Sequence, residues 1–206
     1  MKNIIIWGAK GQGLMAKEVA QELGLNCISF FDNNRNIKSP LKDIPIYYDI
    51  EELKRFENEY FTVGIGYDHN IDRYKISKKL SDLGFKSIKL ISTKAYVSPS
   101  SSIMDGVQIF ANSVIMPKVY IGEYSSISPS VTISHDCIIG KGVFMSAGIT
   151  LCGEVEIGEF TVIGAGATIL PRIKIGKNVA IGAGSVVTKD INDNQIVYGN
   201  PARLKL

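Results

Sequence analysis

The sequence is poor in cysteine and has no long apolar segment. Its 206 residues include only three cysteines, Cys27, Cys137 and Cys152, which form no CxxC pair and leave one over. This pattern argues against a disulfide framework. No apolar run approaches the ~20 residues of a membrane span, and the run Ile4–Trp7 is too short for a signal-peptide core. We therefore expect a protein of the reducing cytoplasm that does not insert into a membrane.

An excess of charge of one sign is absent as well. Lys and Arg number 23 against 20 Asp and Glu, a net charge of +3, and the two signs are interspersed. Such a balance gives little support to nucleic-acid binding and suits an enzyme with anionic small-molecule ligands. The seven prolines are outnumbered by 20 glycines, and 45% of the residues are hydrophobic. These proportions predict many tight turns and enough apolar side chains for one or two cores.

The first 92 residues alternate strand-like and helix-like patterns. Three apolar runs, at 4–7, 27–31 and 61–66, resemble buried strands, and Ser87–Ile91 is predicted as a closing strand. Apolar residues at helical spacing follow the first run up to Gly24 and the third up to Gly84. Alternating strands and helices favour a parallel sheet, so residues 1–92 are predicted to form a Rossmann-like α/β domain.

From Val97 onward a period of six replaces this pattern. An aliphatic residue or Met occupies every sixth position without a break, which gives sixteen hexapeptides between Val97 and Asn192. Four residues after it, the chain repeatedly carries a small or β-branched residue such as Ser113, Val131 or Cys137. A helix with 3.6 residues per turn cannot keep such a period on one face. A solenoid in which each hexapeptide supplies one short strand and one corner can. Residues 93–206 are therefore predicted to form a parallel β-helix whose ends are capped by the α/β domain and the C-terminal tail.

These features together resemble the hexapeptide-repeat, left-handed β-helix acyltransferases. The nearest subgroup comprises the sialic acid O-acetyltransferases and the bacterial N-acetyltransferases of UDP-, GDP- or dTDP-linked 4-amino sugars. The likeness extends over most of the chain. It rests on the glycine turn at 8–13, Phe31-Asp32-Asn33, Gly64-Ile65-Gly66, the repeats, Ser134-His135-Asp136-Cys137 and the ending Gly199-Asn200-Pro201-Ala202-Arg203.

The resemblance implies a function and an assembly. Acetyl-coenzyme A (acetyl-CoA) would be the co-substrate, and a nucleotide-linked 4-amino-4,6-dideoxy sugar would accept the acetyl group at its 4-amino nitrogen, for surface glycan synthesis. The protein would be a homotrimer. Two alternatives stay open at this point: O-acetylation of sialic acid or a related sugar, and a non-catalytic β-helix that serves as a binding surface. No regular row of threonines supports the second alternative.

His135 is the candidate general base. Acetyl transfer needs a group that takes the proton of the nucleophile, and the neighbouring carboxylate of Asp136 could fix the imidazole tautomer and raise its basicity. The other histidine, His69, is interpreted as a loop or helix-start residue. The resemblance supports His135 and Asp136 as the catalytic pair and implies that the backbone N–H of Gly153 stabilises the oxyanion. No metal is expected, because the metal-dependent β-helical relatives need three histidine ligands.

The resemblance also assigns two binding sites. Gly153, Ala165 and Ala183 would contact the coenzyme. Phe144 stands where relatives often have a second histidine that contacts it. Sugar-nucleotide binding maps onto the first glycine turn and the ends of the second and third strands. The positions are Lys10, Gly11, Gln12, Asp32, Asn33 and Gly66. Cys137 and Cys152 are interpreted as structural, because they lie at or beside inward-facing repeat positions.

Overall fold

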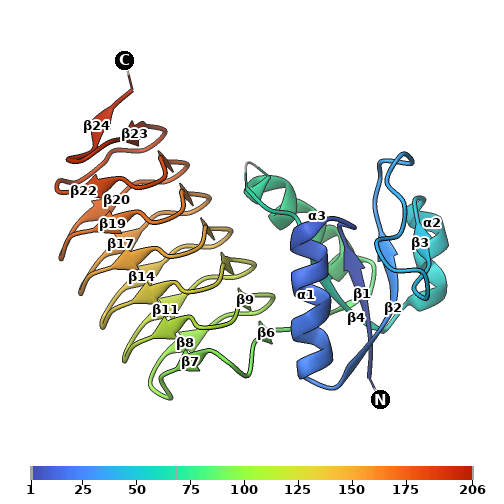
Figure 1. Ribbon diagram of the computed structural model, residues 1–206. Coiled ribbons are helices and arrows are strands. Elements are labelled where there is room, and N and C mark those ends of the chain that lie inside the picture. Colours follow the sequence, from blue (N-terminus) through green and yellow to red (C-terminus); the bar gives the residue numbers. More distant parts are fainter. Residues whose placement is uncertain (1, 68, 206) are drawn as a thin grey trace.

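The computed structural model describes residues 2–67 and 69–205 as an α/β domain joined to a parallel β-helix. Figure 1 shows the α/β domain beside the first coils, with α1 and α3 on the side that faces the β-helix and the C-terminus at the far end. The ends of the two predicted domains, residues 1 and 206, lie outside the described residues. No helix in the described part of the chain is long and apolar enough to span a membrane.

The α/β domain has a five-stranded parallel sheet of order β3-β2-β1-β4-β5. Its order reverses beside β1, as in nucleotide-binding folds. Alternate residues of β1 face opposite sides: Ile4 and Ile6 pack towards α1, whereas Ile5 and Trp7 pack with side chains of α2 and α3. The strands are β1 (Lys2–Trp7), β2 (Leu25–Phe31), β3 (Ile46–Tyr47), β4 (Tyr60–Val63) and β5 (Lys86–Ser87). The helices are α1 (Gly11–Glu22), α2 (Ile50–Leu53), the 3-10 turn η1 (Lys54–Phe56) and α3 (Asn70–Asp82).

The predicted closing strand at Ser87–Ile91 is divided between the two domains. Its first part is β5, which pairs with β4. Leu90–Ile91 forms β6, which pairs with β9 of the β-helix. Ile91 lies six residues before Val97 and so has the same position in the hexapeptide repeat. This part of the segment therefore joins the β-helix. The segment β3-α2-η1, which covers the outer edge of the sheet, was not predicted from the sequence.

Successive strands of the β-helix pass in turn to three parallel sheets, here called faces I, II and III. Face I contains β6 (Leu90–Ile91), β9 (Gln108–Ile109), β12 (Ser126–Ile127), β15 (Phe144–Met145), β18 (Val162–Ile163), β21 (Ala180–Ile181), β23 (Ile196–Tyr198) and the antiparallel β24 (Arg203–Leu204). Face II contains β7 (Tyr96–Val97), β10 (Val114–Ile115), β13 (Thr132–Ile133), β16 (Thr150–Leu151), β19 (Thr168–Ile169) and β22 (Val186–Val187). Face III contains β8 (Ser102–Ile103), β11 (Tyr120–Ile121), β14 (Ile138–Ile139), β17 (Glu156–Ile157) and β20 (Lys174–Ile175).

The period of six has the predicted structural basis. The aliphatic residue of each hexapeptide and the residue four positions later fill one continuous core. The hydroxyls at buried fifth positions are satisfied: Ser125 donates to the Gly140 carbonyl and Thr161 to the Gly176 carbonyl. The corner residue between these two core positions has a left-handed backbone, with φ of +61° at Asn112 and +57° at Asp136. Gly140 must be glycine because a Cβ there would lie 2.7 Å from the Glu159 nitrogen of the next coil.

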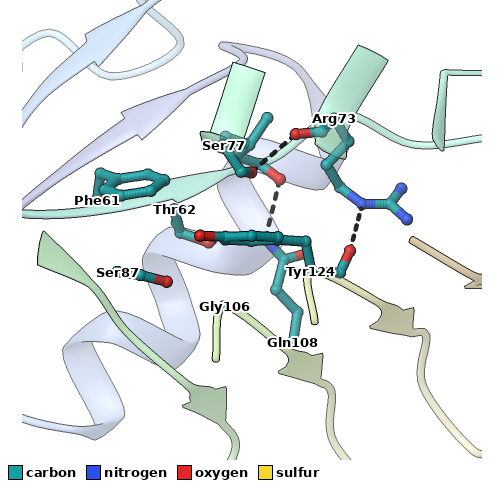
Figure 2. A pocket seen from close by; sticks show the side chains of 9 residues that line it. Phe61, Thr62, Arg73, Ser77, Ser87, Gly106, Gln108 and Tyr124 are labelled. Carbon is teal, nitrogen blue, oxygen red and sulfur yellow. Dashed lines mark hydrogen bonds between the residues drawn. The ribbon is translucent and has the colours of Figure 1, made fainter. Parts of the chain in front are cut away.

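The α/β domain packs against face I and against the corner between faces III and I. Gln108 of face I donates to the Thr62 hydroxyl and to the Val63 carbonyl, and α3 contacts the corner that contains Tyr124. Figure 2 shows these side chains converging between α3, β4 and the first coils. This packing fixes which face of the β-helix lies next to the ends of the parallel strands.

Candidate active site

A pocket of about 750 Å³ opens where β1, β2 and β4 end. In a doubly wound sheet, ligands bind outside the carboxyl ends of the strands where the order reverses, and this pocket lies there. Its floor includes Phe144 of β15, so the pocket extends from the α/β domain to face I. The lining consists of Trp7 to Lys10, Gln12, Asp32, Asn33, Asn34, Ile37, Gly64, Ile65, Gly66, Tyr67, His69, Asp72, Lys75, Ile76 and Phe144.

Three glycines allow the turn after β1 to lie against the end of β4. A Cβ on Gly8 would lie 2.4 Å from the Gly64 oxygen, and one on Gly13 would lie 1.9 Å from the Gly8 oxygen. The turn leads directly into α1, whose N-cap residue, Lys10, makes no side-chain capping hydrogen bond. The first backbone N–H groups of a helix lack intrahelical partners and carry the positive end of the helix dipole. The entrance of α1 is therefore suited to a phosphate.

Five of the six predicted substrate-binding residues line this pocket: Lys10, Gln12, Asp32, Asn33 and Gly66. Gly11, the sixth, is the exposed first residue of α1 and does not line it.

Two of these five side chains are already engaged within the protein. Asp32 accepts hydrogen bonds from the backbone N–H groups of Asn34 (3.0 Å) and Ala9 (3.4 Å), which shapes the loop after β2. Gln12 donates to the Ser126 hydroxyl of face I at 3.1 Å.

Several lining residues were not predicted as binding residues. Tyr67 and Lys75 are among them, and the rings of Tyr67 and Phe144 are nearly perpendicular, with centroids 6.2 Å apart. His69 is the N-cap residue of α3, as its interpretation as a helix-start residue predicted, and it also lines the pocket. Its Nδ1 lies 3.3 Å from Asp72 Oδ2. Tyr67 and His69 lie in the irregular segment after β4, and Lys75 is a polar residue of α3. The helical spacing of apolar residues predicts the helix but does not show that its polar residues line a pocket.

The predicted catalytic pair lies at the corner between faces II and III. His135 Nδ1 is 2.9 Å from Asp136 Oδ2, and the second carboxylate oxygen of Asp136 is 3.8 Å from Lys118 Nζ. When Nδ1 carries the proton that it shares with Asp136, the lone pair of Nε2 is left for an incoming group. Both side chains are about half exposed. The corner therefore presents an oriented imidazole at the surface.

Gly153 lies one coil further along the same corner, directly beneath the imidazole. A Cβ on Gly153 would be 2.7 Å from both Cε1 and Nε2 of His135. The backbone holds this stacking, since Glu154 N–H donates to the His135 carbonyl at 3.0 Å. Any side chain at position 153 would thus displace the ring.

A single chain does not bring the predicted site residues together. His135, Asp136 and Gly153 occupy the corner between faces II and III, opposite face I and its pocket. Ala165 and Ala183 are exposed at the corner between faces I and II, and Phe144 is buried on face I. The predicted coenzyme contacts are therefore distributed over three different parts of the β-helix surface.

The cysteines occupy structural positions. Cys137 is fully buried in the core of the β-helix, and its Sγ lies 3.1 Å from the Cys152 carbonyl oxygen. Burial raises the pKa of the Cys137 thiol, which disfavours the nucleophilic thiolate. In the α/β domain, burial raises the pKa of Cys27 to about 11.

Two family models match the chain, one on each domain. The model described as "PglD N-terminal domain" matches residues 3–80. The model described as "Bacterial transferase hexapeptide (six repeats)" matches residues 100–135 and 154–189. Together they match most of the α/β domain and two segments of the β-helix, one on either side of Phe144.

Solved structures match the same combination of domains over almost the full length of both chains. PerB from Caulobacter crescentus, in complex with CoA and GDP-perosamine, is 28% identical with a TM-score of 0.92, over 100% of this chain and 98% of that one. The acetyltransferase domain of PglB from Neisseria gonorrhoeae, in complex with acetyl-CoA, is 29% identical with a TM-score of 0.89, over 99% of each chain.

WeeI from Acinetobacter baumannii, at 23% identity, shares the fold with a TM-score of 0.87. With an α/β domain of the PglD type, an unbroken hexapeptide β-helix and full-length likeness to two acetyltransferases, the chain belongs to the PglD-like hexapeptide-repeat acetyltransferases, a family of acetyl-CoA-dependent sugar N-acetyltransferases.

Proposed function

We propose that this protein transfers the acetyl group of acetyl-CoA to the 4-amino group of a nucleotide-linked 4-amino-4,6-dideoxy sugar, in the cytoplasm and for surface glycan synthesis. The observation that carries the proposal is the combination of an oriented His135–Asp136 pair with a pocket of nucleotide-binding geometry. GDP-perosamine in the PerB complex is a substrate of this kind. The three free cysteines suit a reducing compartment.

His135 acts as the general base in this mechanism. Its Nε2 takes a proton from the sugar's amine while the amine nitrogen attacks the thioester carbonyl carbon. Asp136 holds the proton on Nδ1 and stabilises the imidazolium that forms. The Gly153 N–H faces the oxyanion of the tetrahedral intermediate. As the intermediate collapses, the carbon–sulfur bond breaks and the imidazolium returns its proton to the thiolate. The products are the N-acetyl sugar and coenzyme A.

The nucleotide sugar is bound by the α/β domain. The N-terminus of α1 and Lys10 meet the diphosphate, and Asn33 and Gly66 line the remainder of the same pocket. Asp32 acts mainly by shaping the loop after β2, because both of its oxygens accept backbone N–H groups.

A homotrimer completes the site in this proposal. His135 lies at the corner opposite the face that forms the floor of the pocket, so the base for one pocket must come from another subunit. A second subunit that lays its II–III corner along the I–II corner of the first would bring His135 near the first subunit's pocket. The groove between these corners would contain Gly153 from one subunit and Ala165 and Ala183 from the other.

The small residues of the I–II corner fit a pantetheine chain. Ala165 and Ala183 are exposed, and added Cβ atoms on their neighbours Gly166 and Gly184 would meet nothing within 4 Å. This leaves a narrow strip where a ligand can approach the backbone closely. Phe144 lies between this strip and the pocket, and it presents an aromatic ring where relatives often have a histidine.

The test is thiol release from acetyl-CoA with a panel of UDP-, GDP- and dTDP-linked 4-amino-4,6-dideoxyhexoses, plus free and CMP-linked sialic acid. Turnover of one amino sugar that is lost in His135→Ala supports the proposal. Turnover with sialic acid alone would replace it with O-acetylation. A folded oligomer that is inactive with every acceptor would contradict it.

A further inference from the structure

Arg73 is the largest of the fully buried side chains, and its environment sets it apart from the other cations of the protein. It is 1% exposed, although it carries a guanidinium group. It projects from the first turns of α3 into the boundary between the two domains, where Figure 2 shows it beside Tyr124. Burial lowers its pKa to about 9, so the group remains protonated at neutral pH. A buried cation requires hydrogen-bond partners that replace its water.

Backbone carbonyls from both domains supply these partners. Nε donates to the Tyr124 oxygen at 3.1 Å, and Nη2 donates to the oxygens of Gly142 and Val143 at 3.1 Å each. Nη1 donates to the Ile65 oxygen at 3.3 Å. The first three acceptors belong to the β-helix and the fourth to the segment after β4. One side chain therefore binds both domains at once.

The acceptors show how α3 is aligned on the β-helix. Asn70 donates to the Phe160 carbonyl, and Arg73, three residues later, donates to carbonyls one and two coils earlier. Three helical residues rise about 4.5 Å, close to the ~4.8 Å spacing of adjacent parallel strands. The helix thus runs along the III–I corner, where Asn70 contacts one coil and Arg73 the two coils before it, and Tyr74 packs between the rings of Tyr124 and Phe160.

The same side chain lies directly behind the pocket. The guanidinium carbon is 5.5 Å from the centroid of Phe144, and Phe144 and Ile65 both line the pocket. Arg73 therefore fixes the distance between the floor of the pocket, which belongs to the β-helix, and the wall formed by residues 64–66, which belongs to the α/β domain.

We propose that Arg73 is a positioning residue for the nucleotide sugar: it holds Phe144 and the 64–66 segment in one rigid wall across the domain boundary. It is not a catalytic residue, because it reaches the pocket only through Ile65 and Phe144. The proposal rests on the proposed function for the identity of the ligand. It predicts that loss of the guanidinium impairs binding at the interdomain pocket far more than coenzyme binding, because Gly153, Ala165 and Ala183 lie at the two other corners of the β-helix.

The test compares Arg73→Met and Arg73→Lys with Ser81→Ala as the matched control. Ser81 bonds the Tyr124 hydroxyl at 3.1 Å, in the same interface but at the other end of α3. Arg73→Met should raise the KM for the amino-sugar nucleotide roughly tenfold or more, because small displacements of a binding wall are costly. The KM for acetyl-CoA should rise much less, and the oligomeric state should not change. Arg73→Lys, which keeps the charge and part of the hydrogen bonding, should lie between, and Ser81→Ala should match the wild type.

Two results would overturn the inference. One is an unchanged KM for the sugar nucleotide in a folded Arg73→Met protein. The other is an equal rise of both KM values, which a general loss of structure would cause. If Arg73→Met does not fold, Arg73→Lys must show the selective rise by itself, and its absence there counts equally against the inference.

Calorimetric titration with UDP, GDP and dTDP separates this inference from the proposed function. A wild type that binds a nucleotide without acetylating any amino sugar would contradict the proposed function. The inference then depends on whether Arg73→Met lowers the affinity for that nucleotide in the same titration. Unchanged nucleotide affinity would refute it.

Discussion

The β-helix and the α/β domain position their functional groups in different ways. In the β-helix, every side chain belongs to a column of residues one coil apart, so His135 has Pro117 on one side and Gly153 on the other. In the α/β domain, the pocket is formed by the segments that follow three strands and by the first turns of α3, and Gly8, Gly13 and Gly64 let two of these segments pack closely. The column determines where along the β-helix axis a side chain lies and in which direction it points. The loops at the ends of the parallel strands, by contrast, surround a ligand.

This difference suggests that the β-helix corner supplies catalysis and the α/β domain supplies substrate binding, which steady-state kinetics can separate. Changes at the II–III corner should act on kcat, because they alter the base and its surroundings. Changes in the α/β domain should act on the KM of the sugar nucleotide, because they alter ground-state binding.

His135→Ala should lower kcat by roughly 10²–10⁴-fold, because proton removal from the nucleophile loses its base. The KM for the sugar nucleotide should change little, since the pocket proposed to bind it is lined by other residues. Steady-state thiol release measures both values. A variant that keeps kcat and loses only affinity for the sugar nucleotide would contradict a catalytic role for His135.

Gly153→Ala should lower kcat by roughly 10–100-fold, because the new methyl group would displace the imidazole from its place above residue 153. The comparison variant is Gly66→Ala in the pocket, where an added Cβ meets nothing within 4 Å and any effect should fall on the KM of the sugar nucleotide rather than on kcat. Activity and the thermal midpoint should be recorded for both variants. Wild-type activity in Gly153→Ala would show that the ring does not need this position.

Asp136→Asn should lower kcat roughly tenfold, because the imidazolium loses its carboxylate partner. Asn tolerates the left-handed backbone that Asp136 adopts, so the corner itself should be preserved. Crystallography or circular dichroism can verify that. A pH profile identical to that of the wild type would argue against a role for the carboxylate in tuning the base.

Glu22→Gln tests the join between the domains and should leave kcat unchanged. Hydrogen bonds from Ser92 are the largest cause that lowers the Glu22 pKa, followed by those from Thr93, with Lys94 nearby. A lowered pKa stabilises the fold above the ordinary value of 4.5, and this contribution is lost as the pH falls below it. The variant should lose about 1 kcal/mol of stability at pH 7 and less at pH 4. Equal losses at both pH values in denaturant titrations would contradict the carboxylate's role.

The β-helix was also easier to predict from the sequence than the pocket of the α/β domain. The period of six fixed the phase of every core position from Val97 onward, because a parallel β-helix repeats one local geometry. The repeat also draws attention to His135, since neighbouring coils have Pro117, Gly153 and Pro171 at that corner. The II–III corner could therefore be located from the sequence, whereas its remoteness from the pocket depends on the packing of the α/β domain on face I.

The pocket was less predictable. Lys10, Gln12, Asp32, Asn33 and Gly66 were assigned by resemblance, and the structure places them around one cavity. Tyr67 and His69 follow β4 without a periodic pattern and Lys75 is a polar residue of the predicted helix, so only the fold relates them to the glycine turn. Arg73 has the sequence context of an ordinary helix residue. Its burial arises from the alignment of α3 with the coils, which no local pattern encodes.

The central claim is that each site combines the pocket of one subunit with His135 of another. Complementation between two inactive variants tests it most directly. Gly66→Trp should fill the pocket without disturbing the backbone, since the space above Gly66 is open, and His135→Ala removes the base. Mixed oligomers prepared from both variants should regain a substantial fraction of wild-type turnover, because some sites then receive an intact pocket and an intact base. Mixed oligomers that form and remain inactive would contradict a site shared between subunits.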